Sequence, residues 1–446
     1  DIGIKVNRRW EFDPDNKHLN EELKKIINEI RATDDPGTLF FATHANRNVI
    51  KIITSIKYPG TDYTIMGPDD FSDPSVLKIF GRYPTEQRTP GYYSDGIYAL
   101  SPFIADIAGE KARIFRKKFQ EKYNEEPSWS AACYYDAMHV AVTAIKHAEI
   151  YGSDIRKNRR KLRDTLAAFD SYELALKGVS GDIFFDINGN THRPLMVGIY
   201  ENHQLLPTFS QYQGLLSEKG VGKRITDAFQ KEDTATSRNG EAMAKTRVVY
   251  AGIDINEISN LDVLNQTCTI DFYLWFQFHG AFDDANIRFV NAVDPVLLDR
   301  PAMDVMIEED VTIRTYRVTA DFKNDFALYA YPFGQEVLRI RLCHTDMARN
   351  ELVYVPNIRS MYQAREKKNI GKTMFRGITG WHIDEITFYQ NITKVPAPDN
   401  KTIAFSQFNA DIRIKRKEQS LIFKHLLLRL QLSCCYILFI SFPPVR

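Results

Sequence analysis

The first part of the chain, to about residue 200, alternates short apolar runs with stretches of helical periodicity. Apolar runs of strand length lie at residues 39–42, 63–66 and 96–100. Helical spacing of apolar positions follows at residues 46–56, 110–123, 130–149 and 155–169, and Asp73-Pro74 is typical of a helix start. Because strands that alternate with helices commonly pair in parallel, we expect a parallel, doubly wound α/β sheet.

A polar turn interrupts the apolar pattern near the end of this region. Residues 181–190 place Asn188-Gly189 between apolar runs, which is typical of a β-hairpin turn. A calcium-binding loop is the alternative, but the segment lacks the regular acidic ladder and the closing Glu of such a loop. We therefore expect a hairpin here and no metal site.

From Thr246 onward the helical period gives way to strict alternation. In residues 268–278 the apolar side chains Ile270, Phe272, Leu274 and Phe276 share one face. Similar segments lie at residues 311–322, 337–342, 352–355, 381–389 and 410–415. Many short strands separated by turns predict an antiparallel, immunoglobulin-like β-sandwich with one face of each sheet buried.

Residues 215–247 separate the two patterns. This stretch is charged, contains three glycines and includes a polar run at residues 233–237. Only the apolar set at residues 225–229 is compatible with a short helix. We therefore predict a linker at residues 213–246, between an α/β domain at residues 1–212 and a β-sandwich at residues 247–418.

Composition excludes several classes of function. The 446 residues carry a net charge of +1, so the chain lacks the basic excess expected of a nucleic-acid-binding protein. The five cysteines form no CxxC pair, and their odd number and irregular spacing argue against a zinc site and against a disulfide framework. No HExxH, GxSxG or complete phosphate-binding loop occurs. We expect a protein that is not an enzyme and needs no cofactor.

The C-terminal segment has two interpretations. Residues 421–442 are rich in Leu, Ile and Phe and approach the length of about 20 residues that a bilayer-spanning helix needs. However, Lys424, His425 and Arg429 interrupt this segment. The alternatives are a buried helix or strand and a truncated first membrane span at residues 419–446, and its position after the sandwich favours the span.

Two stretches of the α/β region resemble the type I periplasmic binding proteins of the branched-chain amino-acid family. They are residues 123–128 leading into Tyr134-Tyr135-Asp136-Ala137, and residues 181–190. The resemblance implies a small polar ligand, such as an amino acid, in a cleft between two lobes. It places Asp69 against the ligand's ammonium group and His44 against the ligand as well. The alternatives are a turn or helix-cap role for Asp69 and an exposed loop position for His44.

The same resemblance implies that residue 1 falls midway through the second lobe. The helix at residues 130–149 is then expected to pack on a lobe that precedes this sequence. We therefore expect the chain to be part of a longer protein.

The β-rich half resembles the extracellular domain of prokaryotic-type pentameric ligand-gated ion channels. The resemblance rests on residues 253–276, 380–383 and 412–416 and on the corner Tyr331-Pro332-Phe333-Gly334-Gln335. It implies that Tyr331, Pro332, Phe333 and Gln335 form the loop that couples ligand binding to a pore. The family's usual Asp is Gly334 here. Asn324 and Leu338 occupy the positions at which eukaryotic members carry a disulfide.

Together these resemblances imply a subunit of a ligand-gated channel with a fused binding domain. Such a subunit is expected to form a homo-pentamer in the inner membrane, with these domains on the periplasmic or extracellular side. The alternative is a periplasmic solute-binding protein of amino-acid ABC transport that is fused to a β-sandwich.

Overall fold

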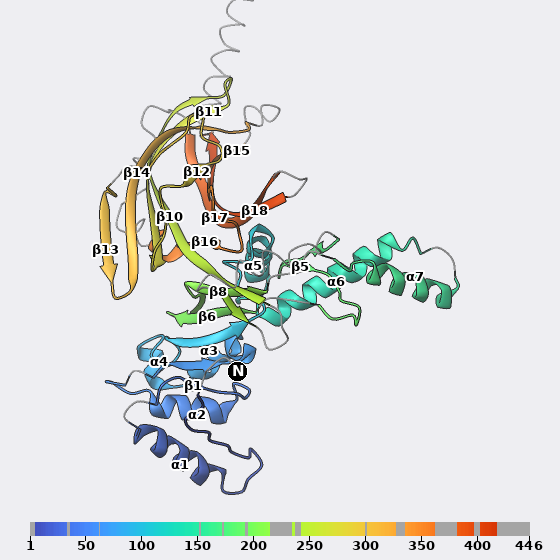
Figure 1. Ribbon diagram of the computed structural model, residues 1–446, viewed down its shortest axis with the longest axis vertical. Helices are drawn as coiled ribbons and strands as arrows, with labels where there is room; N and C mark the ends of the chain where they lie inside the picture. Colours follow the sequence, from blue (N-terminus) through green and yellow to red (C-terminus); the bar gives the residue numbers. More distant parts are fainter. Residues whose placement is uncertain are drawn as a thin grey trace, which may run out of the picture. The chain divides into compact units, whose positions relative to one another are not determined.

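The computed structural model describes residues 5–33, 36–61, 63–150, 153–171, 174–191, 195–214, 234–236, 242–298, 301–326, 335–361, 381–396 and 402–416. The chain divides into two compact units. Unit 1 contains residues 1–248 and 349–353, and unit 2 contains residues 249–348 and 354–446. Figure 1 shows the elements of both units and labels many of them.

A five-stranded sheet with the order β1-β2-β3-β6-β7 forms the centre of unit 1. Its parallel part consists of β1 (Leu39–Phe40), β2 (Ile65–Gly67) and β3 (Ile97–Ser101). In contrast, β6 (Met196–Glu201) runs antiparallel to β3 and to β7 (Gln204–Pro207).

The three predicted strands, β1, β2 and β3, therefore pair in parallel as expected, whereas β6 and β7 were not predicted and make the sheet mixed. A tight turn at Asn202 and His203 joins β6 to β7. Both residues have a left-handed backbone, with φ of 49° and 63°. This conformation at both central positions is that of the tight two-residue turn that joins antiparallel strands.

Helices connect the parallel strands of unit 1. α1 (Leu19–Arg31) precedes β1, and α2 (Arg47–Ile56) leads from β1 to β2. The helices η1 (Asp69–Ser72), α3 (Ser75–Phe80) and α4 (Pro84–Arg88) lie between β2 and β3. Apolar residues three or four apart bury one face of α1 and of α2 in a shared core: Leu23, Ile26, Ile27, Ile30, Val49, Ile50, Ile53 and Ile56.

Three longer helices follow β3, close to the predicted ranges. They are α5 (Glu110–Tyr123), α6 (Trp129–His147) and α7 (Ile155–Ala167). α6 begins at Ser128, whose hydroxyl oxygen accepts a hydrogen bond from the backbone N–H of Ala131. α5 and α6 contribute to a small second core with Phe103 and Val179. α7 buries none of its side chains.

The polar turn at residues 181–190 is a hairpin turn, as predicted. The short strands β4 (Leu176–Lys177) and β5 (Asp182–Ile183) precede it. The Asp186 backbone N–H donates to the Asn190 carbonyl, and Gly189 has a φ of 80°. Glycine adopts this left-handed conformation without steric cost, which explains the Asn-Gly signal in the sequence.

The predicted linker is only partly described by the structure. β8 (Ser210–Gly214) pairs with residues 243–247 of the long strand β10 (Ala242–Asp262), and β9 (Thr234–Thr236) pairs with residues 242–244. Both ends of the predicted linker are therefore strands. The expected short helix at residues 225–229 lies outside the described residues.

Unit 2 is built from two sheets in which neighbouring strands run antiparallel, except that the backbone hydrogen bonds from Arg247 N–H to Glu351 and from Asn357 N–H to Ala251 make β16 (Leu352–Pro356) parallel to β10. The larger sheet has the order β13-β14-β11-β10-β16, from β13 (Asp304–Glu308), β14 (Val311–Lys323), β11 (Thr267–His279), β10 and β16. The smaller has the order β12-β15-β18-β17, from β12 (Ile287–Phe289), β15 (Gln335–His344), β18 (Thr402–Arg416) and β17 (Trp381–Pro396).

The two sheets face each other across an aromatic core. Phe272 and Phe322 of the larger sheet contact Phe289 of the smaller sheet, with ring centroids 6.1 and 6.0 Å apart. The predicted alternation in β11 is confirmed, because Ile270, Phe272, Leu274 and Phe276 are all fully buried. The two layers of the expected sandwich are therefore present, but its strands are not all antiparallel, because β16 pairs in parallel with β10.

The segment predicted to enter the membrane, residues 419–446, lies outside the described residues. Among the helices that the structure does describe, none is both long enough and apolar enough to cross a bilayer.

Candidate functional site

The two predicted ligand residues of unit 1 lie beyond the carboxyl ends of neighbouring parallel strands. β1 and β2 pair through Leu39 opposite Ile65, so the loops that follow them begin at the same edge of the sheet. His44 follows β1, and Asp69 follows β2. Open α/β sheets commonly bind ligands at this edge.

The loop after β1 holds His44 through the start of α2. The Asn46 side-chain oxygen caps the helix by accepting hydrogen bonds from the N–H groups of Asn48 and Val49, at 2.9 and 3.1 Å. The Asn46 N–H in turn donates to the His44 carbonyl at 2.7 Å. His44 is therefore two residues before a fixed helix terminus, and its ring extends outward.

The loop after β2 is anchored by Phe71, which is fully buried. A Cβ atom on Gly67 would lie 2.2 Å from the Phe71 ring, so only glycine leaves room for that ring at the end of β2. Because Phe71 points into the core, the preceding residues Asp69 and Asp70 are kept at the partly exposed edge. Phe41 contacts Phe71, with ring centroids 6.0 Å apart, and closes the apolar floor beneath them.

The structure joins His44 to Asp70 and not to Asp69. The Nδ1 atom of His44 makes an ion pair with Oδ2 of Asp70. The hydrogen bond and the charge of Asp70 raise the pKa of His44 above its ordinary value, and the charge of Asp69 raises it further. Sequence reasoning did not predict this role of Asp70.

Asp69 has different surroundings. Its backbone carbonyl accepts a hydrogen bond from the Ser72 hydroxyl, which stabilises the turn of η1. Within the described residues its carboxylate accepts no hydrogen bond and forms no ion pair. When His44 is protonated, it neutralises Asp70, and the three side chains together then carry a net charge of −1. Such a group of charges favours a cationic ligand group such as an ammonium.

The predicted coupling loop in unit 2 is visible only at its ends. Tyr331, Pro332, Phe333 and Gly334 lie outside the described residues, and Gln335 is the first residue of β15. The structure therefore does not test the role predicted for this loop.

The base of that loop is closed by Asn324, which is buried. Its Oδ1 atom accepts a hydrogen bond from the Arg339 N–H at 2.7 Å. Its Nδ2 atom donates to the Phe322 carbonyl at 3.1 Å and contacts the Cys268 sulfur at 3.2 Å. A side-chain amide thus links the end of β14 to β15 and to β11. Cys133, Cys268 and Cys343 form no disulfide.

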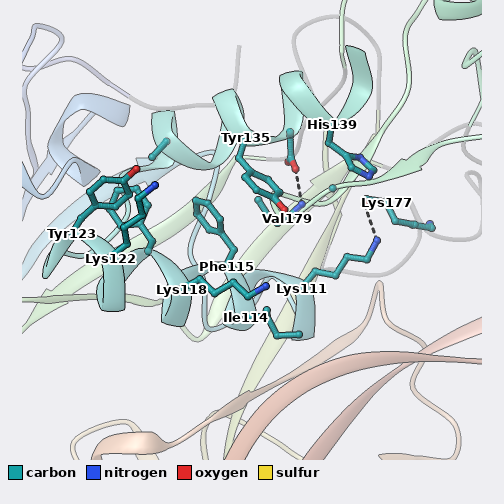
Figure 2. Close-up of a pocket in the computed structure, with 14 residues that line it drawn as sticks. Lys111, Ile114, Phe115, Lys118, Lys122, Tyr123, Tyr135, His139, Lys177 and Val179 are labelled. Atoms are coloured by element: carbon teal, nitrogen blue, oxygen red, sulfur yellow. Dashed lines mark hydrogen bonds between the residues drawn. The ribbon is translucent and has the colours of Figure 1, made fainter. Parts of the chain in front are cut away.

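A cavity in unit 1 lies apart from His44 and Asp69. It lies between α5 and α6 and has a volume of about 480 Å³ (Figure 2). The polar edge at β1 and β2 is the better candidate for a polar ligand, because the wall of this cavity is mainly aromatic and aliphatic. The described residues contain no group of three or more His, Cys, Asp or Glu side chains that could hold a metal ion.

Comparison with known proteins supports the resemblance of unit 1 to periplasmic binding proteins. Residues 22–200 match the periplasmic binding protein family. The match runs from α1 to β6 and so includes the edge that carries His44, Asp69 and Asp70. It covers less than half of the chain and concerns unit 1 alone. No curated protein matches the chain significantly. No match supports the resemblance of the second half to ligand-gated channels.

Proposed function

We propose that unit 1 binds a small, amine-bearing polar ligand, such as an amino acid, at the carboxyl edge of β1 and β2. The observation that carries this proposal is the gathering of His44, Asp69 and Asp70 at that edge. The similarity of residues 22–200 to periplasmic binding proteins supports a ligand-binding role. Binding needs no bond-making step, so we propose a receptor-like protein and not an enzyme.

Each side chain of the site has a distinct role in this proposal. The Asp69 carboxylate receives the ligand's ammonium group. Asp70 holds the His44 ring in place through their ion pair. The exposed His44 ring then lies over the ligand, while Phe41 and Phe71 form an apolar base beneath the site.

Direct binding measurements test the role of Asp69. The purified chain is titrated with single amino acids in calorimetry, and the best ligand is compared with its analogue that lacks the amine. Asp69→Ala should weaken binding of the amine-bearing ligand about tenfold, the value of one charge-assisted contact. Asp164→Ala, which removes an exposed carboxylate on α7, should leave the affinity unchanged. Equal affinities for wild type and Asp69→Ala would refute the proposal.

The ion pair predicts the direction of a pH effect. The pKa of His44 is raised, so its positive charge persists above the ordinary value near 6.5 and is lost as the pH rises further. Loss of this charge leaves two carboxylates facing the ligand. Affinity for an ammonium ligand should therefore increase as the pH rises through the raised pKa. His44→Gln should abolish this increase, and an unchanged pH profile in that variant would contradict the role of His44.

The exposed face of α6 supports a second lobe beside this site. Tyr134, Met138, Val142 and Ile145 are spaced by four, four and three residues and therefore share one side of the helix. All four are exposed, with 76% of Tyr134 and 65% of Met138 open to solvent. Since α6 is apolar on its buried side as well, it has the pattern of a helix that is covered on both sides. We infer that a further lobe packs here and completes the ligand cleft.

The finer proposal is a subunit of a pentameric receptor channel, with both units on the periplasmic or extracellular side of the inner membrane. The two β-layers of unit 2 and the closed base of the loop at Asn324 support it. The alternative is a periplasmic solute-binding protein of ABC transport. Sedimentation of the full-length protein separates these proposals: a membrane-extracted pentamer favours the channel, whereas a monomer released by osmotic shock favours the transport protein.

A further inference from the structure

The groove between α5 and α6 combines an aromatic wall with a row of cationic side chains. Its volume of about 480 Å³ is in the range of small-molecule sites. Figure 2 shows α5 on one side, α6 on the other and the segment around Val179 at the end. This groove has no part in the ligand site described above.

The aromatic wall is continuous. Phe115 contacts Tyr135 of α6 at a centroid distance of 5.0 Å and Phe119 at 5.8 Å. Phe119 contacts Tyr123 at 4.6 Å. Because residues 115 to 123 span eight helical steps of 1.5 Å, this row is about 12 Å long. It offers an apolar surface, made of rings tilted by 48° to 50° to one another, for a ligand of comparable length.

The lysines accompany the aromatic row along the same helix. Lys111, Lys118 and Lys122 line the groove from α5, at spacings of seven and four residues. Lys111 donates to the Lys177 carbonyl at 2.9 Å, and Lys122 lies 5.2 Å from the Tyr123 ring centroid. The charge of Lys122 therefore lies next to the aromatic row, and the charge of Lys111 is fixed at the Lys177 carbonyl.

The one carboxylate in the lining of the groove is already engaged. Asp136 is fully buried and accepts hydrogen bonds from the N–H groups of Val179 and Ser180, at 2.7 and 2.9 Å. The Ser180 hydroxyl also donates to it. These hydrogen bonds connect residues 179 and 180 to α6, and they engage both carboxylate oxygens of Asp136. Among the described residues that line the groove, Asp136 is the only carboxylate that could balance the lysines.

We propose that this groove binds a small anionic amphiphile: a molecule with a linear or aromatic apolar body and a carboxylate or phosphate head. The apolar body lies along Phe115, Phe119 and Tyr135. The acidic head meets Lys118 and Lys122. Charge complementarity excludes a cationic amphiphile, and the apolar wall disfavours a small hydrophilic anion.

Decanoate, whose extended chain matches the length of the aromatic row, is the first probe. Calorimetric titration of the whole chain below the micelle concentration should show saturable 1:1 binding. Decyl phosphate should also bind, whereas decanol and decylamine should bind at least about tenfold more weakly, because they lack the charge or reverse it. Equal binding of decylamine and decanoate would overturn the proposal.

Charge-reversal variants locate the site. Lys118→Glu/Lys122→Glu should weaken decanoate about tenfold or more, and Tyr135→Ser, an exposed substitution, should weaken it as well. The matched control is Lys117→Glu, on the same helix but outside the lining of the groove. It should change the affinity less than about twofold. A loss in Lys117→Glu equal to that of the double variant would mean that the overall charge of α5, and not the groove, attracts the probe.

Two further measurements distinguish the groove from the amine-ligand site and from a membrane-binding surface. Asp69→Ala should leave decanoate binding unchanged, so that failure of the amine-ligand proposal and failure of this one can be told apart. Vesicles of phosphatidylcholine with one quarter phosphatidylglycerol test a membrane surface as the anionic partner. Binding to these vesicles without binding to soluble decanoate or decyl phosphate would overturn the proposal.

Discussion

Replacing Asn324 should destabilise the β-sandwich of unit 2 more than any exposed change nearby. Asn324 is 5% exposed, and its Oδ1 atom is the acceptor for the Arg339 N–H. Asn324→Ala leaves this backbone donor without an acceptor, which costs about 1–3 kcal/mol. The cavity left by the amide adds about 1 kcal/mol. The free energy of unfolding should therefore fall by about 2–4 kcal/mol.

Asn324→Asp separates the two hydrogen-bonding roles of this side chain. Asp keeps an oxygen that can accept a hydrogen bond, but it lacks the Nδ2 group that donates. An Asp oxygen can still accept from the Arg339 N–H, but the second oxygen would face the Phe322 carbonyl and the Cys268 sulfur, which now accept from Nδ2. A buried carboxylate there has a raised pKa, since its charged form is disfavoured. The variant should be destabilised at pH 7 and should recover part of its stability as the pH falls and the carboxyl group is protonated.

Urea unfolding of the whole chain, followed by tryptophan fluorescence, measures both effects. Hydrogen exchange of the peptide that contains Arg339 shows whether this amide loses protection in Asn324→Ala. The matched control is Asp325→Ala, at a neighbouring side chain that is 96% exposed. It should change stability by less than about 0.5 kcal/mol. If Asn324→Ala is as stable as this control, or if the Arg339 amide keeps its protection, the hydrogen-bond account of the loop base is wrong.

Three other predictions concern positions outside the ligand sites. Glu86 is buried and accepts from the N–H groups of Gly91 and Tyr93, so Glu86→Gln should lower the melting temperature of unit 1 by about 4–8 °C in calorimetry, equivalent to about 2 kcal/mol. A Cβ atom on Gly252 would lie 2.3 Å from the indole ring of its cross-strand partner Trp275, so Gly252→Ala should destabilise unit 2 and change its tryptophan fluorescence; an unchanged spectrum and stability would contradict this packing. Burial raises the pKa of Asp271, but hydrogen bonds led by Arg317 outweigh it and lower that pKa to about 2. This contribution of about 2 kcal/mol is complete above pH 4 and lost between about pH 4 and 2, and Asp271→Asn should flatten the stability profile in that window.

The strands and helices with a regular apolar pattern could be predicted from sequence, because that pattern alone shows which of their side chains are buried. Ile270, Phe272, Leu274 and Phe276 alternate with other residues, so they lie on the same face of the strand regardless of which strands pair with it. All four side chains are buried. The same holds for α2, where Asn46 marks the start and the apolar side chains follow at helical spacing. The Asn188-Gly189 turn was predictable because glycine tolerates the left-handed backbone there.

The direction of strands and the choice of partners were not predictable in this way. β6 has the same apolar composition whether it runs parallel or antiparallel to β3, and its direction depends on the path that the chain takes through α5, α6 and α7 before it returns to the sheet. Likewise, nothing in the spacing of His44, Asp69 and Asp70 indicates which carboxylate meets the imidazole.

The sequence by itself therefore determined the α/β character of the first region, the two-layered β character of the second and the edge of the sheet at which polar side chains gather. Only the tertiary structure decided that Asp70 pairs with His44, that Asn324 closes the base of a loop and that lysines and aromatic rings of α5 share a groove with α6. The physical reason is that periodicity fixes which side of an element is buried. Pairing between side chains far apart in sequence depends on how those buried sides meet.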